Sequence, residues 1–273
     1  MLNQLKLELK RAFSSSGMLL SLGIGIAINL IHITKTPPFQ QNYMIPDFES
    51  YPLAYPCTVI ENWIGADLIS LESFLFYMLM PLLAALPFAS SFFYDKQSGY
   101  LKNVYVRTSR TEYLITKYIS VFISAGVAII VPLIINLSVC MILMPNILPQ
   151  PSDARSGISP SDMFSVLFYT KPTLYLILFL VINFIFAGLF ACISLTCSFF
   201  TNYKIIVLIC PFFVHLILDT FCDLIDQYGW SCTNFLRTGH GIPHFLVLII
   251  YLILGIAGTT IGYFYKGVRE DVF

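Results

Sequence analysis

The sequence predicts an all-α membrane protein formed by a single transmembrane domain, residues 1–273. Two observations predict this class: only 11% of the residues are charged, and the mean hydropathy is +0.79. Soluble domains contain about 25% charged residues, so the chain is too apolar for that class. The apolar stretches, such as LILFLVINFIFAGLF, lack the polar alternation of a β-barrel and therefore indicate helices.

Six apolar stretches are long enough to cross a bilayer. A hydrocarbon core about 30 Å thick requires roughly 20 helical residues. Because backbone amides in lipid must pair internally, helices are favoured over any open sheet. The predicted spans are approximately residues 17–34, 68–93, 118–144, 172–200, 205–222 and 244–265.

The basic residues predict the orientation of these spans. With the N-terminus inside, 11 of the 15 Lys and Arg residues lie on the inner side. The four on the outer side are Lys35, Arg155, Lys171 and Arg237. Cytoplasmic segments carry such an excess, so both termini are predicted to be cytoplasmic. No small-x-small cleavage site follows the first apolar stretch, so we expect no cleaved signal peptide.

The N-terminal segment MLNQLKLELKRAF has an amphipathic pattern. Leu2, Leu5, Leu9 and Phe13 share one helical stripe, while Lys6 and other polar residues lie elsewhere on the circumference. Residues 1–14 are therefore predicted to form an interfacial helix in the headgroup layer. The alternative is a basic flank that only fixes topology.

The connector after the second span, YDKQSGYLKNVYVRTSRTEYLITKY at 94–118, contains five of the 15 basic residues. Ser98 is a predicted cap for a short helix whose Leu101, Val104 and Tyr105 form an apolar edge. Basic residues flank that edge. Such a helix suits insertion into a groove on another protein, whereas the alternative is that the charges only enforce topology.

A second helix start follows within the same connector. Ser109 and Glu112 have the spacing of a capping box and precede a long apolar stretch. The third span is therefore predicted to begin near Arg110, inside the cytoplasm.

Several of these features together resemble the membrane permease subunit of an ABC type-2 exporter. They are the amphipathic N-terminal helix, six spans with both ends inside, D-K-x-x-G at 95–99, R-T-S-R at 107–110, Tyr113 and Lys117. The topology is similar over nearly the whole chain, and the motifs are similar over 94–118. The outer loops at 35–67 and 145–171 are long for that family, so they are candidates for ligand recognition or for packing over the mouth.

The resemblance implies a coupling helix that docks on a cytoplasmic ATP-binding subunit. Gly99 would open this helix, Leu101 to Arg107 would form it, and Ser109 would start the third span. The residues expected to couple to the ATPase are Gly99, Leu101, Lys102, Val104, Tyr105 and Arg107. A second permease copy, or a homologous permease, would complete the export path as a dimer in the bilayer of a bacterial plasma membrane.

The chain lacks the phosphate-binding motif G-x-x-x-x-G-K-[ST]. We therefore expect no cofactor and no enzymatic activity in this chain, with ATP and Mg bound by the partner ATPase. A peptide, an antimicrobial or another amphipathic molecule would be the cargo. The near-zero net charge disfavours nucleic acid as a partner.

Ionisable residues within the spans provide a different hypothesis. His215, Asp219 and Asp223 recur at helical spacing on the fifth span, and Glu72 lies near the outer end of the second. They are candidates for a proton or cation relay or for the outer mouth of a path, and the alternative is a structural or solvated role. A proton- or ion-coupled carrier is thus the alternative function, and a non-transporting membrane sensor or assembly partner is the third.

The remaining polar patterns do not identify a metal centre. The motif H-E-x-x-H is absent and the four histidines are scattered. Cys57, Cys222 and Cys232 fall near the outer face, where one disulfide could form in an oxidising compartment. The segment between the fifth and sixth spans is either a plain outer loop or, as the resemblance implies, a re-entrant hairpin.

Overall fold

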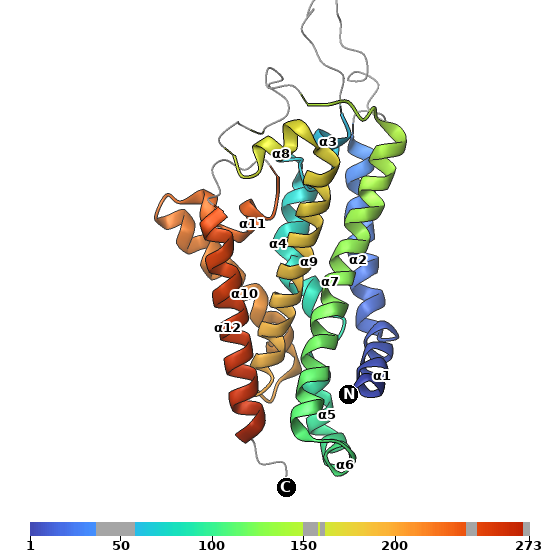
Figure 1. Ribbon diagram of the computed structural model, residues 1–273, viewed down its shortest axis with the longest axis vertical. Coiled ribbons are helices and arrows are strands. Elements are labelled where there is room, and N and C mark those ends of the chain that lie inside the picture. Colours follow the sequence, from blue (N-terminus) through green and yellow to red (C-terminus); the bar gives the residue numbers. More distant parts are fainter. Residues whose placement is uncertain (37–57, 150–157, 159–161, 239–244, 270–273) are drawn as a thin grey trace, which may run out of the picture.

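The computed structural model describes residues 1–36, 58–149, 158, 162–238 and 245–269. Within these ranges the chain forms helices and no strands. Five helices are long and apolar enough to cross a membrane: α2 (Ser16–Lys35), α7 (Arg110–Leu143), α9 (Pro172–Cys197), α10 (Lys204–Leu224) and α12 (Phe245–Arg269). They run along the long axis of the molecule (Figure 1), which confirms an all-α protein of membrane type.

The second predicted span, 68–93, is not one helix. It is divided into α4 (Leu71–Ala85) and α5 (Ser91–Gln97) by a turn. Pro87 lies in that turn, and because proline has no N–H, the carbonyl of Leu83 loses its intrahelical donor. The hydroxyl of Ser21 on α2 donates to this carbonyl at 2.8 Å. With 15 residues, α4 alone is shorter than the roughly 20 residues that a bilayer requires.

Pro211 in α10 is accommodated by the same device. Its missing N–H leaves the carbonyl of Val207 without the usual helical donor. Ser194 on the neighbouring α9 donates its hydroxyl to that carbonyl. At Pro87 and Pro211, hydroxyl donors from neighbouring helices thus satisfy the freed carbonyls, as expected where no water reaches the backbone.

Two phenylalanine–glycine pairs join α7 and α9, the most extensively packed pair of helices. The ring of Phe184 on α9 covers Gly126 on α7, and a Cβ on Gly126 would lie 2.4 Å from that ring. Reciprocally, Phe122 on α7 covers Gly188 on α9, where the corresponding distance is 2.5 Å. The two rings meet edge to face, 5.9 Å between centroids. The missing side chains of the glycines therefore allow this close packing.

The N-terminal helix α1 (Leu2–Phe13) has one face buried and an apolar stripe exposed in part. Glu8 and Ala12 are buried against the bundle, whereas Leu2 is 74% and Phe13 is 41% exposed. An apolar stripe left uncovered by the protein is the arrangement expected of an interfacial helix.

The short helices lie at the two ends of the bundle (Figure 1). α1, α5 and α6 (Tyr100–Arg107) lie at one end, called here the α6 end. α3 (Val59–Asn62) and α8 (Ser165–Thr170) lie at the opposite end, called the α3 end.

The segment after α10 folds back into the bundle. It contains η1 (Tyr228–Trp230) and α11 (Cys232–Phe235). The buried ring of Phe235 lies 5.2 Å from the ring of Phe186 on α9 and 5.3 Å from that of Tyr251 on α12. The backbone N–H of Thr238 then donates to the carbonyl of Gly65 at 2.8 Å. The described residues after α10 therefore pack among the long helices as well as over their ends.

Candidate functional site

The predicted coupling segment forms a helix, α6, between two backbone breaks. Gly99 precedes it with φ at 70°, a left-handed conformation that favours glycine, so Gly99 rather than Ser98 occupies the N-cap. At the far break, the hydroxyl of Ser109 accepts the N–H of Glu112 at 3.3 Å. α7 begins at Arg110, which confirms the predicted start of the third apolar helix.

The apolar edge of α6 is covered within this chain. Leu101 is 1% and Val104 is 9% exposed, and Tyr105 lies edge-on to Tyr113, 5.8 Å between ring centroids. Leu101 and Val104, which were expected to enter a groove on another protein, are thus buried against this chain, whereas Tyr105 is only partly buried. The helix presents to solvent a different face: Lys102, Asn103, Val106 and Arg107.

Beneath α6, a buried ion cluster joins three helices. Lys117 of α7 places its Nζ 2.7 Å from Oε2 of Glu8 on α1 and 2.6 Å from Oδ2 of Asp95 on α5. All three residues are at most 2% exposed. A buried charge without a partner is strongly unfavourable, so the three helices are tied to one another through Lys117.

Arg11 and Tyr113 complete this cluster. Arg11 donates to Oδ1 of Asp95 at 2.7 Å and to Oε1 of Glu8 at 2.8 Å. The hydroxyl of Tyr113 donates to Oδ2 of Asp95 at 2.6 Å. Two cations therefore face two carboxylates. Burial opposes ionisation of Asp95, but the charge of Lys117 and the hydrogen bonds from Arg11, Lys117 and Tyr113 lower the pKa of Asp95.

Sequence reasoning found only part of this cluster. Asp95, Tyr113 and Lys117 belong to the motifs that carry the family resemblance, but Glu8 and Arg11 were not singled out. The available signal was the single carboxylate in an otherwise basic helix, with a cation three residues later. A helical wheel does not show that Glu8 faces the protein, because the apolar face of α1 is defined by its leucines and Glu8 lies on the polar side.

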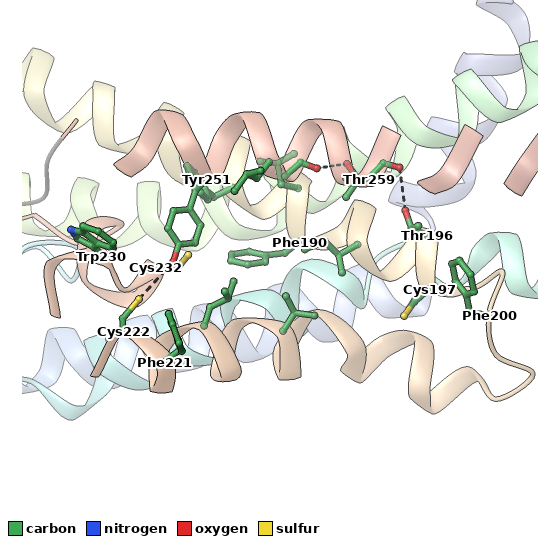
Figure 2. Close-up of a pocket in the computed structure, with 18 of the residues that line it drawn as sticks. Phe190, Thr196, Cys197, Phe200, Phe221, Cys222, Trp230, Cys232, Tyr251 and Thr259 are labelled. Carbon is green, nitrogen blue, oxygen red and sulfur yellow. Dashed lines mark hydrogen bonds between the residues drawn. The ribbon is translucent and has the colours of Figure 1, made fainter. Parts of the chain in front are cut away.

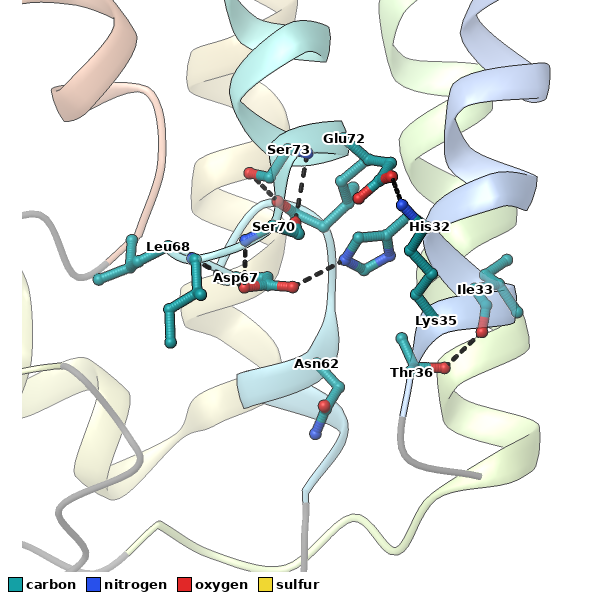
Figure 3. A network of polar contacts seen from close by, with 12 residues as sticks. His32, Ile33, Lys35, Thr36, Asn62, Asp67, Leu68, Ser70, Glu72 and Ser73 are labelled. Atoms are coloured by element: carbon teal, nitrogen blue, oxygen red, sulfur yellow. Dashed lines mark hydrogen bonds and ion pairs between the residues drawn. The ribbon is translucent and has the colours of Figure 1, made fainter. Parts of the chain in front are cut away.

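A polar network at the α3 end holds Glu72, one of the predicted path residues (Figure 3). Glu72 pairs with Lys35 of α2, and the adjacent His32 has its Nε2 3.1 Å from Oδ2 of Asp67. Burial opposes ionisation of Asp67. The hydrogen bonds from His32 and from the backbone N–H groups of Ile69 and Ser70 nevertheless lower the pKa of Asp67 to about 2.

Asn136 connects this network to α7. Its Nδ2 lies 3.3 Å from Nδ1 of His32, and its Oδ1 accepts the N–H of Ile64 at 3.1 Å. The neighbouring indole of Trp63 donates to the carbonyl of Leu133 at 3.3 Å. The described residues 58–67 are thus packed and hydrogen-bonded over this end of α2 and α7.

His215 and Asp219 lie together on α10 but in a different network from Glu72. Nε2 of His215 is 3.3 Å from Oδ2 of Asp219 and 3.1 Å from the hydroxyl of Thr233. Asp219 accepts hydrogen bonds from the hydroxyl of Ser231 at 2.8 Å and from the N–H of Cys232 at 3.0 Å. These contacts anchor the start of α11 and favour the structural interpretation of the pair. Asp223 is exposed one turn further along α10.

An apolar pocket of about 610 Å³ lies between α9, α10 and α12. Figure 2 shows Trp230 and Cys222 near one end of the pocket, Thr196 and Phe200 near the other, and Phe190 between them. Aromatic and aliphatic side chains form most of its lining. Its volume falls within the range of about 300 to 1,000 Å³ that is common for ligand sites, and its lining suits an apolar group.

The described cysteines and acidic residues form no metal centre. No group of three or more His, Cys, Asp or Glu side chains in the described ranges could hold a metal ion. Cys222 and Cys232 are free thiols in the structure. Cys57, the third cysteine considered for a disulfide, lies outside the described residues, as do residues 37–57 of the predicted loop 35–67 and residues 150–157 and 159–161 of the predicted loop 145–171.

Geometry and composition thus define a helical membrane-type protein with a buried ion cluster at one end. Known proteins do not extend that description: no protein family, curated protein or solved structure matches this chain.

Proposed function

We propose that this chain is the permease subunit of an ATP-driven exporter of the ABC type-2 class. In this proposal six segments cross the cell membrane, with α4 and its following turn as the second, and both termini are cytoplasmic. Two permease subunits form the translocation path, and separate ATP-binding subunits hydrolyse ATP at the α6 end. The basic-residue asymmetry supports this orientation.

The buried ion cluster is the observation that carries the proposal. Force applied to α6 reaches α7 directly through Ser109, and it reaches α1 and α5 through Lys117. A rigid connection between a short surface helix and several long helices is what a coupling element requires. A connector whose charges only fixed topology would not require Glu8 and Asp95 to be buried with Lys117.

The burial of α6 changes the proposed docking face. Because Leu101 and Val104 pack inside the chain, contact with an ATPase would use the exposed face. Val106, 83% exposed, is its apolar centre, and the basic residues Lys102 and Arg107 lie on the same exposed side. An apolar centre with a charged rim is the usual composition of a protein interface.

The apolar pocket supports an amphipathic or hydrophobic cargo. It lies along three helices that are long enough to cross a membrane, and few polar groups line it. A molecule with one apolar face or chain would therefore be accommodated better than an ion or a sugar.

Co-purification from native membranes tests the function. Under mild extraction, the wild-type chain should retain an ATPase and support nucleotide-dependent transport. Val106→Asp should lose both while the protein remains folded, because the position is exposed. Val166→Asp, at an equally open position on α8 (76% exposed), is the matched control and should retain both. A wild-type chain that retains no ATPase and transports without nucleotide would overturn the proposal.

A further inference from the structure

A second cavity, of about 760 Å³, lies at the α6 end of the bundle. Three parts of the chain enclose it: the junction of α1 and α2, the turn between α4 and α5, and the first residues of α10. It differs from the apolar pocket in composition, since basic side chains, several hydroxyl groups and leucines line it together.

The charge in this cavity is positive. Arg11 and Lys204 are lining residues, and no Asp or Glu belongs to the described lining. Arg11 is neutralised by the buried carboxylates beside it. Nζ of Lys204 lies 4.8 Å from the ring centroid of Tyr94, and no carboxylate in the described ranges forms an ion pair with it. Lys204 therefore supplies a net positive charge to the cavity.

The start of the 20-residue helix α2 borders the same space, with Ser16 and Gly17 of its first turn in the lining. The side chain of Ser15 accepts the N–H of Met18. The positive end of the helix dipole adds to the charge of Lys204 and favours an anion.

The apolar part of the lining indicates what is attached to the anion. Leu20 and Leu208 project from α2 and α10, two helices long enough to cross a membrane. A ligand that binds at the cationic end can therefore extend an alkyl chain between these helices. Basic pockets between helices at the cytoplasmic side of a membrane are suited to anionic lipid headgroups.

We propose that this cavity binds the phosphate group of an anionic glycerophospholipid from the inner leaflet. Lys204 and the start of α2 contact the phosphate, and the acyl chains lie along Leu20 and Leu208. The proposal rests on the proposed orientation, in which the α6 end is cytoplasmic, but not on the exporter function.

Lipid binding to the purified full chain tests this site. Retained lipids are counted by native mass spectrometry after reconstitution with phosphatidylglycerol or phosphatidylcholine. Wild type should retain phosphatidylglycerol preferentially. Lys204→Met should weaken that preference about fivefold, the effect of one basic residue near a membrane surface. Lys204→Arg should restore the preference.

Lys171→Met is the matched control. Lys171 lies at the start of the long helix α9, as Lys204 lies at the start of α10, but Lys171 directly follows α8. Its lipid preference should equal that of wild type. Thermal unfolding in phosphatidylcholine, unchanged by Lys204→Met, would show that the variant is folded. Equal lipid retention by Lys204→Met and wild type would overturn the proposal. Displacement of the lipid by inorganic phosphate at equal concentration would assign the site to a soluble phosphate compound. That result would overturn the proposal that the cavity binds a lipid.

Discussion

Nζ of Lys117 on α7 lies 2.7 Å from Oε2 of Glu8 on α1, across 109 positions of sequence. The side chains of both residues are at most 1% exposed. Removing two charges from water costs several kcal/mol per ion, and only close pairing and further hydrogen bonds offset that cost. Asp95 supplies the second partner of Lys117 at 2.6 Å. The position of the N-terminal helix is therefore set by charge as well as by its leucines.

Glu8→Gln should release α1 from the bundle. The substitution leaves two cations facing one carboxylate in a buried site, and breaking such a pair costs about 3 to 5 kcal/mol. We expect rapid cleavage within α1 by a protease added at the α6 end, together with lower thermal stability.

The double variant Glu8→Gln with Lys117→Met is the control for charge balance. It again leaves one cation facing one carboxylate, so its stability should lie closer to wild type than that of Glu8→Gln alone. If the double variant lost more free energy of unfolding than the two single variants lose in sum, the role of pairing would be contradicted.

Gly126→Ala and Gly188→Ala should each separate α7 from α9. A Cβ at either position would lie within 2.5 Å of a phenylalanine ring, and overpacking of this kind costs about 1 to 3 kcal/mol. Gly23→Ala is the control, because apart from its chain neighbours and the nearby backbone of its own helix, no described atom lies within 4 Å of the Cβ position there. Denaturant unfolding of the three variants checks the order. Equal stability of Gly23→Ala and Gly126→Ala would contradict the close packing.

Much of the local structure was predictable because it depends on local sequence. Ser109 and Glu112 predicted the start of α7, and the apolar stretches predicted the long helices. The packing of α7 on α9 was not predicted, although F-x-x-x-G occurs in both helices, at 122–126 and 184–188. A glycine in such a motif does not identify which other helix will pack its phenylalanine ring against it.

The predicted docking residues show a second limit of sequence. Spacing identified the apolar edge of Leu101 and Val104, but periodicity cannot tell whether the same chain or another protein covers such an edge. The break after α4 has a similar origin. Pro87 alone does not show whether a helix bends or ends there, and the carbonyl that it frees is satisfied by Ser21, which lies 62 positions away in the sequence.

Asp67 should make the α3 end sensitive to acid. Its pKa in the folded chain is about 2, below the ordinary value of 3.8. A lowered folded-state pKa contributes stability that is present above pH 3.8 and is lost as the pH falls toward 2. After allowance for solvent screening, we expect the free energy of unfolding to fall by about 1 kcal/mol. Unfolding measured between pH 5 and 2 should show this decline, which should be smaller in Asp67→Asn.

His215→Gln and Asp219→Asn should leave transport at least partly intact. The Asp219 side chain accepts hydrogen bonds from Ser231 and from the backbone of Cys232, so its role in the structure is to hold α11. Neither substitution should create or remove dependence on a proton gradient. Complete loss of flux from a folded, assembled variant would favour the ion-coupled carrier instead.

Asn103 and Leu148 should lie on opposite sides of the membrane. Asn103 is exposed on α6, and Leu148, 60% exposed, follows α7 at its other end. The excess of basic residues near α6 predicts that Asn103 lies inside. In a cysteine-free background, a membrane-impermeant maleimide added to intact cells should therefore label Leu148→Cys and spare Asn103→Cys. Permeabilised cells should label both, which would show that the thiol of Asn103→Cys is present and reactive. Labelling of Asn103→Cys in intact cells would place α6 outside, where no cytoplasmic ATPase could bind it, and the exporter proposal would fail with the topology.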